Sequence, residues 1–310
     1  MVDLAVIIVS YNVRELLAQT LRSLKAALTD GALRTRVLVV ENQSHDGSGD
    51  MVRKHFPHVE VLEPGENLGF AGGNNLALRH LGFGDGQAGM AEFVWLLNPD
   101  TEVPSEAPQQ LVEHLRAYPE VGAVGPQLRF SDGSFQHSAF AFPGLVQVAL
   151  DLFPVHARLL QSRLNGRYPQ TQWEGNEAFS VDMLLGASLM VRGATVDQVG
   201  LLDAGYFMYA EELDWCRRIH EAGWKVHALP SVTVVHHGGQ STQQFRDRMF
   251  VALWRSRLRY YEKWETPLYV AAVRALLRLG VAWHRFQLGR REPDDELHRR
   301  LAAYQEVATL

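Results

Sequence analysis

Three acidic residues stand close together in the segment Tyr209-Ala-Glu-Glu-Leu-Asp-Trp-Cys-Arg-Arg218, at the start of a helical pattern that ends at Gly223. On a helix that turns by about 100° per residue, Glu211 and Asp214 would share a face while Glu212 projects away from it. One carboxylate could then enter a site as a general base while another anchors the turn. The alternative is a helix start enriched in acids that complement the helix dipole.

A second group of polar residues contains candidate ligands for a divalent cation. Asp100 closes the segment Leu96-Leu-Asn-Pro-Asp100, and His236 and His237 follow the apolar run Val232-Thr-Val-Val235. Because side chains alternate along a strand, only one of the two imidazoles can face the same site as Asp100. Mg²⁺ or Mn²⁺ on a carboxylate and an imidazole, with a separate carboxylate as base, can move a group off a diphosphate. A turn aspartate and structural histidines are the alternatives.

Two further segments are suited to binding a sugar nucleotide. The loop Asn67-Leu-Gly-Phe-Ala-Gly-Gly-Asn-Asn75 offers flexible backbone and amide side chains, but it lacks the GxGxxG spacing of a dinucleotide site. Its alternative is a plain transition from loop to helix. Glu41, directly before Asn42, ends a strand-like run and can accept hydrogen bonds from a ribose or a base. A surface turn is the alternative there.

The segments between these residues alternate between strand and helix patterns. Apolar runs predict strands at 4–10, 36–40, 59–62, 92–97, 121–130 and 181–191, and helical spacing predicts helices at 13–28, 48–55, 73–81 and 106–118. This alternation predicts an α/β fold with a mixed, mainly parallel sheet and helices on both faces. Ligands of such sheets bind at the carboxyl ends of the strands, where Glu41 and Asp100 stand. Asn12 and Glu15 have the spacing of a capping box.

The rest of the chain is less regular. Residues 136–177 are rich in aromatics, proline and arginine without a clear period, and we interpret them as an insertion over the site. Beyond residue 239, helical patterns at 245–264 and 267–286 are loaded with arginine, tyrosine and tryptophan. We therefore expect a catalytic domain at residues 1–242 and a helical C-terminal extension at residues 243–310.

Composition excludes several classes of protein. The 310 residues are 46% hydrophobic and 21% charged, which is typical of a globular protein, and the net charge of −5 offers no field for nucleic acid. The single cysteine, Cys216, excludes an internal disulfide and fits a reducing compartment. The apolar run Leu4–Val9 is too short for a signal peptide, and no run reaches the roughly 18 apolar residues of a spanning helix. We expect a cytoplasmic protein.

Seven segments, taken together and in this order, resemble the family 2 inverting glycosyltransferases of GT-A fold, particularly the bacterial rhamnosyltransferase-like branch. They are Ile8-Val-Ser-Tyr-Asn12, Val39-Val-Glu-Asn-Gln-Ser-His-Asp-Gly-Ser48, Asn67-Leu-Gly-Phe-Ala-Gly-Gly-Asn-Asn75, Leu97-Asn-Pro-Asp100, Gly186-Ala-Ser-Leu-Met190, Tyr209-Ala-Glu-Glu-Leu-Asp214 and Val235-His-His-Gly-Gly239. The resemblance covers about residues 3 to 242, and the combination of segments is highly specific.

The resemblance assigns roles to individual residues. The nucleotide-sugar site would comprise Ser10, Tyr11, Asn12, Glu41, Asn67, Gly73, Asn74, Asn98 and Asp100. Glu41 stands where the family usually has an aspartate that contacts the nucleoside. Asp100 ends the Asp-x-Asp metal motif, whose first position is Asn98 here, so that fewer charged ligands remain. The family's Glu-Asp pair appears as Glu211 and Glu212, which gives Glu212 the role of base, and His236 matches the histidine near the metal and diphosphate.

The implied activity is transfer of a sugar from a dTDP- or UDP-sugar, dTDP-rhamnose included, to a hydroxyl of a saccharide or lipid-linked acceptor in cell-envelope polysaccharide synthesis. Inversion and a Mg²⁺ or Mn²⁺ cofactor belong to this expectation. The alternatives are a metal-dependent hydrolase of sugar phosphates, which lacks support because no GxSxG motif occurs, and a non-catalytic sugar-nucleotide-binding protein. The sequence leaves the oligomeric state open.

A lipid-linked acceptor would lie in a bilayer, which gives the C-terminal extension a second interpretation. Its apolar and aromatic residues, in 249–254, 268–281 and at Trp283, alternate with arginines. These arginines are Arg255, Arg257, Arg259, Arg274, Arg278 and Arg285. Such a helix can lie on an anionic membrane surface, here at the inner face of the membrane. The alternative is a packed helical appendix with solvated arginines.

Overall fold

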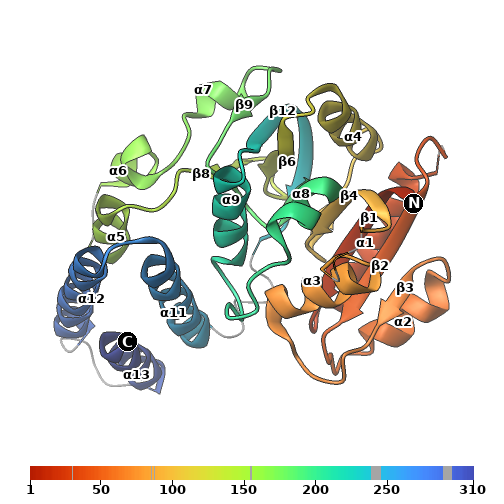
Figure 1. Cartoon of the computed structure of the whole chain (residues 1–310). Coiled ribbons are helices and arrows are strands. Elements are labelled where there is room, and N and C mark those ends of the chain that lie inside the picture. The colour runs from red at the N-terminus through yellow and green to blue at the C-terminus, as the bar shows by residue number, and fades with distance from the viewer. Residues whose placement is uncertain (30, 85, 87, 154–155, 239–245, 289–294) are drawn as a thin grey trace.

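The computed structural model describes residues 1–29, 31–84, 86, 88–153, 156–238, 246–288 and 295–310. A twisted sheet with helices on both faces forms the larger part, and a group of helices lies beside it (Figure 1). The predicted α/β fold with a mixed, mainly parallel sheet is confirmed. Gly239 and the expected domain boundary after residue 242 lie outside the described residues.

The sheet has a parallel half and a mixed half. Its strand order is β3 (Glu60–Leu62), β2 (Thr35–Glu41), β1 (Val2–Ser10), β4 (Ala91–Leu97), β11 (Ser188–Arg192), β6 (Val121–Arg129), β12 (Lys225–His236) and β5 (Thr101–Glu102). The first four strands run parallel, as do β6 and β12, whereas β11 and β5 run antiparallel to their neighbours. The short strands β7 (Phe135–Gln136) and β9 (Phe179–Ser180) pair with β6 and β12.

Helices cover both faces of the sheet and bury two separate apolar clusters. One face carries α1 (Arg14–Ala27), α2 (Ser48–His55) and α4 (Ala107–Ala117), and the other carries α3 (Gly69–His80), α8 (Gly193–Val199) and α9 (Glu211–Glu221). The run Leu4–Ile8 of β1 is almost completely buried because it is covered on both sides. The loops after β1, β2 and β4 therefore meet at one edge of the sheet.

Two local predictions at this edge are wrong. The predicted helix at 73–81 begins four residues earlier, because the Asn67 side chain accepts a hydrogen bond from the Gly69 N–H at 2.9 Å and Gly69 adopts a positive φ of 70°. The capping box of Asn12 does not form. Asn12 has a φ of 52° and accepts from the His45 N–H, while the first N–H of α1 donates to Asp46.

The irregular segment after β7 folds into short elements away from the strand ends. They are β8 (Ala139–Phe140), α5 (Leu145–Leu152), α6 (Ala157–Leu160), the 3₁₀ turn η1 (Arg163–Asn165) and α7 (Gln170–Trp173). The strand predicted at 181–191 is split into β10 (Met183–Leu184), which pairs with β8, and β11. The Leu152 carbonyl accepts from His284 at 2.8 Å, so α5 packs beside the C-terminal helices.

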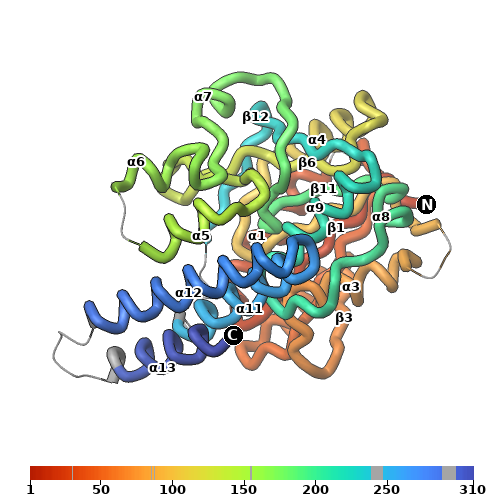
Figure 2. Tube along the Cα trace, turned by 60° about the vertical axis from the view of Figure 1, so that its left-hand side comes forward, coloured from red at the N-terminus to blue at the C-terminus, as the bar shows by residue number. Residues whose placement is uncertain are grey.

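The C-terminal region is helical, as predicted. It contains α11 (Arg246–Trp264), α12 (Pro267–Leu288) and α13 (Asp295–Thr309), of which α13 was not predicted. In Figure 2, α12 runs alongside α11 and α13, with α5 next to it. A third apolar cluster joins Trp254 and Tyr261 of α11 to Leu213 and Cys216 of α9. The extension thus shares a core with the helix that begins at Glu211.

Candidate active site

A cavity of about 300 Å³ lies at the carboxyl ends of β1, β4 and β12, next to the start of α9. Seven of the predicted site residues line it: Tyr11, Asn67, Asn98, Asp100, Glu211, Glu212 and His236. Ser10, Asn12, Glu41, Gly73 and Asn74 lie close by but do not line it. The insertion expected over the site at residues 136–177 contributes no described residue to the lining of the cavity, although Gln136 contacts His236 from behind.

One wall carries the predicted metal ligands. Asp100 and His236 are both buried, and His236 Nε2 lies 3.3 Å from Asp100 Oδ1. Asn98 Nδ2 lies 3.2 Å from the same ring nitrogen. The pairing of β12 with β5 places His236 opposite Thr101, one residue after Asp100. The structure therefore brings His236 to Asn98 and Asp100, from which the sequence separates it by 138 and 136 positions.

The surroundings of His236 fit a cation at this place. Its Nδ1 lies 3.1 Å from Gln136 Oε1, and because an amide oxygen only accepts, this contact assigns the proton to Nδ1. With the proton on Nδ1 alone, Nε2 would present a lone pair to the Asn98 amide and to Asp100 Oδ1, and a cation held between Nε2 and Asp100 would satisfy this arrangement. Within the described residues, no group of three or more His, Cys, Asp and Glu side chains could hold a metal ion. An ion here would take its other ligands from substrate and water.

His237 does not reach this wall. Its Nε2 lies 2.8 Å from Glu102 Oε1, on the opposite side of the strand end from His236. Strand alternation predicted that only one imidazole would face Asp100, and that prediction is confirmed. The backbone N–H of His237 donates to the Asp100 carbonyl at 2.9 Å and so fixes the position of the Asp100 segment.

Two carboxyl groups at the start of α9 line the same cavity. Glu211 and Glu212 are 4% and 9% exposed, and each has one carboxyl oxygen without a hydrogen-bond partner in the described structure. Burial raises the pKa of both groups, and the charge of Glu212 raises the pKa of Glu211 further. Backbone hydrogen bonds from Gly186 and Leu213 favour the ionised form of Glu212. The pair therefore favours one proton on Glu211 and a charge on Glu212.

The expected division of roles among the three acids is wrong in one respect. Glu211 and Glu212 both line the cavity, because the cavity meets the end of α9 rather than one side of it. Asp214 is the anchor: it is fully buried and accepts from Arg218 Nε at 2.9 Å and Trp264 Nε1 at 2.8 Å, and Lys263 Nζ lies 2.8 Å away. Arg218 is thus the arginine that pairs with Asp214, whereas the neighbouring Arg217 pairs with Glu221.

The backbone before α9 is strained. Tyr209 and Ala210 have φ angles of 69° and 64°, a left-handed conformation that costs a non-glycine residue about 1–3 kcal/mol. Contacts from other segments hold this turn: the Met208 carbonyl accepts from Ser256 Oγ at 2.7 Å, and the Phe207 carbonyl accepts from the Phe70 N–H at 2.9 Å. The turn aims Glu211 and Glu212 at the cavity.

The opposite side of the cavity is built by an asparagine network. Asn42, which was not among the predicted site residues, lines the cavity and joins two loops. Its Nδ2 donates to Asn67 Oδ1 at 2.9 Å, and its Oδ1 accepts from the Leu68 N–H at 2.9 Å. Its position directly after Glu41, at a strand end, was the signal that could have identified it.

The remaining predicted residues support this side from outside the cavity. Glu41 Oε1 accepts from the Ser44 N–H at 2.8 Å, and Asn12 Oδ1 accepts from the His45 N–H at 2.8 Å, so both side chains hold the loop after β2. Asn74 Nδ2 donates to the Phe70 carbonyl within α3. A Cβ atom on Gly73 would lie 2.9 Å from Val9, which shows how closely α3 packs on β1. Ser10 is fully buried at the end of β1.

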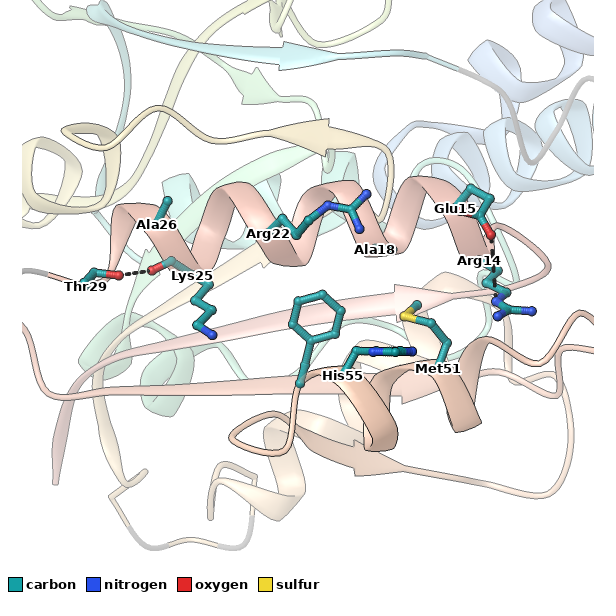
Figure 3. A pocket seen from close by; sticks show the side chains of 10 residues that line it. Arg14, Glu15, Ala18, Arg22, Lys25, Ala26, Thr29, Met51 and His55 are labelled. Carbon is teal, nitrogen blue, oxygen red and sulfur yellow. Dashed lines mark hydrogen bonds and ion pairs between the residues drawn. The ribbon is translucent and has the colours of Figure 1, made fainter.

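Apolar side chains that were not predicted complete the lining. They are Phe70, Leu185, Phe207, Met208 and Met249, and Met249 comes from α11. A second, wider hollow of about 640 Å³ lies between α1 and α2 (Figure 3). Arg14, Arg22, Lys25 and His55 line that hollow, but none of the predicted site residues does. The cavity at the strand ends is therefore the candidate active site.

Comparisons with solved structures agree with this fold. The mannosyltransferase PcManGT from Pyrobaculum calidifontis, solved with GDP-Man and Mn²⁺, matches 99% of this chain and 86% of its own with a TM-score of 0.56 and 18% identity. GalNAc-T7, solved with UDP, GalNAc and Mn²⁺, matches 98% of this chain and 55% of its own with a TM-score of 0.58 and 14% identity. The chain thus has the GT-A fold of glycosyltransferases.

Sequence comparison defines the family. Residues 5–162 match glycosyl transferase family 2. An N-acetylglucosaminyl-diphospho-decaprenol L-rhamnosyltransferase of Mycobacterium tuberculosis is 34% identical over 211 residues, which are 66% of this chain and 67% of the relative. The chain belongs to glycosyl transferase family 2, and the resemblance to its rhamnosyltransferase-like branch is confirmed.

Proposed function

We propose that this protein moves a sugar from a nucleoside-diphosphate donor to a hydroxyl group of a saccharide or lipid-linked acceptor, with inversion at the anomeric carbon. Family membership supports glycosyl transfer. The observation that carries the mechanism is the cavity lined by the buried carboxyl pair of Glu211 and Glu212 together with the pair of Asp100 and His236. One pair can act on the attacking hydroxyl and the other on the departing diphosphate.

Glu212 is the base in this proposal. It takes the proton of the acceptor hydroxyl while the hydroxyl oxygen attacks the anomeric carbon and the bond from that carbon to the diphosphate oxygen breaks. A single displacement of this kind inverts the configuration. Backbone hydrogen bonds from Gly186 and Leu213 support an ionised Glu212, and burial keeps the proton on Glu211. Glu211 then adds no second charge beside the base.

Asp100 and His236 would hold Mg²⁺ or Mn²⁺ beside the diphosphate. A divalent ion supplies positive charge that offsets the charge that develops on the leaving group. The complexes of PcManGT and GalNAc-T7 contain Mn²⁺, which supports an ion here. Asn98 supplies an uncharged amide beside them, so Asp100 is the anionic ligand in this proposal.

The donor nucleotide would occupy the side of the cavity near β1 and β2. Tyr11, Asn67 and Asn98 line it and can contact the donor directly. Asn12 and Glu41 hold the loop after β2, and Ser10, Gly73 and Asn74 belong to the packing of β1 and α3 behind it. Glu41 would reach a nucleoside only if its carboxylate also kept its bond to the Ser44 N–H. Asn42 joins this group as a residue added by the structure.

The acceptor proposal rests on the mycobacterial relative and on the apolar wall. The name of that relative specifies L-rhamnose transfer to N-acetylglucosaminyl-diphospho-decaprenol. We propose dTDP-rhamnose as the first donor to test and UDP-sugars as the next. The proposed acceptor is a diphospho-polyprenol sugar. The reaction would belong to cell-envelope polysaccharide synthesis at the cytoplasmic face of a membrane. Phe207, Met208 and Met249 supply an apolar surface at the cavity for such a lipid.

Release of nucleoside diphosphate tests the proposal. Nucleotide sugars are first screened by thermal shift with Mg²⁺ or Mn²⁺, because a ligand at 100 times its dissociation constant stabilises a protein by about 2.7 kcal/mol. The donors that bind are then incubated with soluble diphospho-lipid acceptors. Acceptor-dependent release with an inverted product supports the transferase. Binding without release, with or without acceptor, would instead favour a non-catalytic binding protein, and phosphate release from sugar phosphates would favour a hydrolase.

A further inference from the structure

Helix α12 is apolar on two opposite sides. Its inner side packs Val270, Val273, Leu277 and Val281 into the third apolar cluster. Its outer side carries a row that we call the outward stripe: Leu268, Ala271, Ala275, Leu279, Ala282 and Phe286. These residues are spaced by three or four positions, so they form one line along the helix. All six are exposed, with Leu268 at 82% and Leu279 at 62%.

The charges on α12 are all of one sign. The 22 residues of the helix include Arg274, Arg278 and Arg285 but no aspartate or glutamate. Arg274 is paired with Glu262 at 2.6 Å. Arg278 and Arg285 are exposed, and neither forms an ion pair with any residue in the part of the chain that the structure describes. Each directly precedes an apolar residue of the outward stripe, so the stripe has unneutralised cations along its side in a chain of net charge −5.

The neighbouring helix α5 continues this surface. Val146 of α5 is 54% exposed, and α5 packs against α12, since Leu152 meets both Gly280 and His284 (Figure 2). The acid of α5, Asp151, is neutralised by Arg257 at 2.6 Å. Of the six arginines that the sequence suggested as membrane contacts, Arg255, Arg257 and Arg259 of α11 are all paired with acids.

We propose that the outward stripe of α12, with Arg278 and Arg285, docks on the surface of an anionic lipid bilayer, with the helix lying in the plane of the interface. An exposed apolar stripe about 27 Å long beside unpaired arginines is suited to acyl chains and acidic headgroups together. Among the described residues no helix is long and apolar enough to cross a membrane, which leaves contact from one side. A symmetric pairing of two α12 helices would bring the unpaired arginines of both copies together, which disfavours a second copy as the occupant.

Docking through α12 would also determine where the active site lies relative to the membrane. Helix α11 packs between α12 and α9 in the third apolar cluster, and its Met249 lines the cavity. A membrane under α12 would therefore hold the cavity near the lipid interface. This consequence for the acceptor rests on the proposed function, whereas the docking itself does not.

Vesicle co-sedimentation without donor or acceptor tests the docking. We expect the wild-type chain to sediment with vesicles of phosphatidylcholine and phosphatidylglycerol, and less as salt is added, but not with phosphatidylcholine alone. The double variant Leu268→Gln/Leu279→Gln should bind at least about ten-fold more weakly because it loses apolar contact. Arg278→Gln/Arg285→Gln should lose about five-fold for each arginine. The controls Met90→Gln/Tyr118→Gln and Arg22→Gln/Lys25→Gln remove two exposed large hydrophobic side chains and two exposed charges elsewhere on the protein, and they should bind as the wild type does.

Three outcomes would overturn the inference. Equal binding by the wild type and both α12 variants would show that another surface meets the lipid, and so would equal loss in the controls. A dimer of the wild type by light scattering that dissociates in Leu268→Gln/Leu279→Gln, without lipid affinity, would show that a second copy covers the stripe. Because binding is measured without substrate, a failed transferase assay would leave the result unaffected, and failed docking would leave the transferase assay unaffected.

Discussion

At the scale of single residues, the buried carboxyl pair at the start of α9 has the most specific consequences. Glu212→Gln should retain donor binding but lower turnover by about 10²–10⁴-fold, the usual contribution of a general base. In the wild type, the rate should fall on acidification at a higher pH than for an exposed glutamate, because burial raises the pKa of Glu212. Steady-state kinetics with a thermal-shift measurement of donor affinity separate the two effects. If Glu212→Gln turned over at the wild-type rate, Glu212 would not be the base, and Glu211 would be the next residue to test.

The protonation of Glu211 should be visible in how the stability of the fold depends on pH. Its folded-state pKa is raised well above the ordinary value of 4.5 by burial and by the charge of Glu212, so the folded state binds more protons than the unfolded state above that pH. Glu211 therefore weakens the fold as pH rises from about 4.5 toward its raised pKa. Glu211→Gln should raise the unfolding temperature near neutral pH and lose this advantage toward pH 4.5. Unfolding curves across that range, with the exposed Glu113→Gln as control, measure it. A pH-independent difference would contradict a shifted Glu211.

The metal ligands give a third residue-scale prediction. Asp100→Ala and His236→Ala should each abolish the extra stabilisation that a nucleoside diphosphate gains from Mn²⁺, since the ion would lose a protein ligand. His237→Ala is the matched control, because its imidazole contacts Glu102 instead. Titration of the nucleoside diphosphate with and without Mn²⁺ gives the affinities. Mn²⁺-dependent binding that survives in both variants would remove the proposed site.

Residue types at strand ends made part of this site predictable. Strand alternation showed that His236 and His237 must face different ways, but only the pairing of β12 with β5 decides which one meets Asp100. The orientation of Glu211 could not be predicted from helix periodicity, since it depends on the left-handed turn at Tyr209 and Ala210. Asn42 and Met249 join the cavity through contacts between distant segments, which periodicity does not encode.

At the scale of elements, α11 and α9 are linked through Asp214. This buried carboxylate is held by Arg218 within α9 and by Lys263 and Trp264 at the end of α11. Loss of a donor to a buried carboxylate costs about 1–3 kcal/mol. Lys263→Met should therefore lower stability by about this amount, and it should lower kcat more than it raises KM, because α9 carries Glu211 and Glu212.

Conservative rescue distinguishes positioning from general stability. Lys263→Arg should restore most of kcat, since a cation again faces Asp214. Lys225→Met removes an exposed cation that pairs with Glu120 at 3.4 Å, and as a control it should change stability by no more than about 1 kcal/mol and leave kcat unchanged. If Lys263→Met lowered kcat and also lowered the solubility of the protein, and Lys263→Arg restored neither, the loss of kcat would reflect general damage to the fold.

Most strands and helices follow from local patterns, and the exceptions have physical causes. The alternation that predicted β1, α1, β2 and α2 reflects burial of strands on both faces and of one helix face. Residues 136–177 gave no period because their elements are only two to eight residues long. The longest of them, α5, packs on the C-terminal helices, which are distant in sequence. The end of β10 and the start of β11 are separated by residues 185–187, which line the cavity instead of continuing a strand.

At the scale of the whole molecule, we propose that the boundary near residue 242 divides two parts that depend on each other for folding. The third apolar cluster combines Trp254, Tyr260 and Tyr261 of α11 with Tyr206 and Leu213 of the sheet domain. Arg259 and Lys263 of α11 also pair with Asp203, which lies in the loop between α8 and α9. A chain that ends at residue 238 would expose the apolar side of α9 to water, and it would release the strained turn at Tyr209 and Ala210 from Ser256.

We therefore expect truncation after residue 238 to give a chain that aggregates or is cleaved between residues 200 and 215 by a low concentration of protease, whereas the full chain resists. The reason is that α9 would lose both its apolar cover and the donors that α11 gives to Asp214, and loss of one donor to a buried carboxylate costs about 1–3 kcal/mol. The matched control is the full chain with Leu268→Gln/Leu279→Gln, which alters the extension only on its exposed side and should resist protease as the wild type does. A soluble, protease-resistant truncated chain with undiminished donor binding would show that the sheet domain folds independently, and α11 would then have no part in shaping the active site.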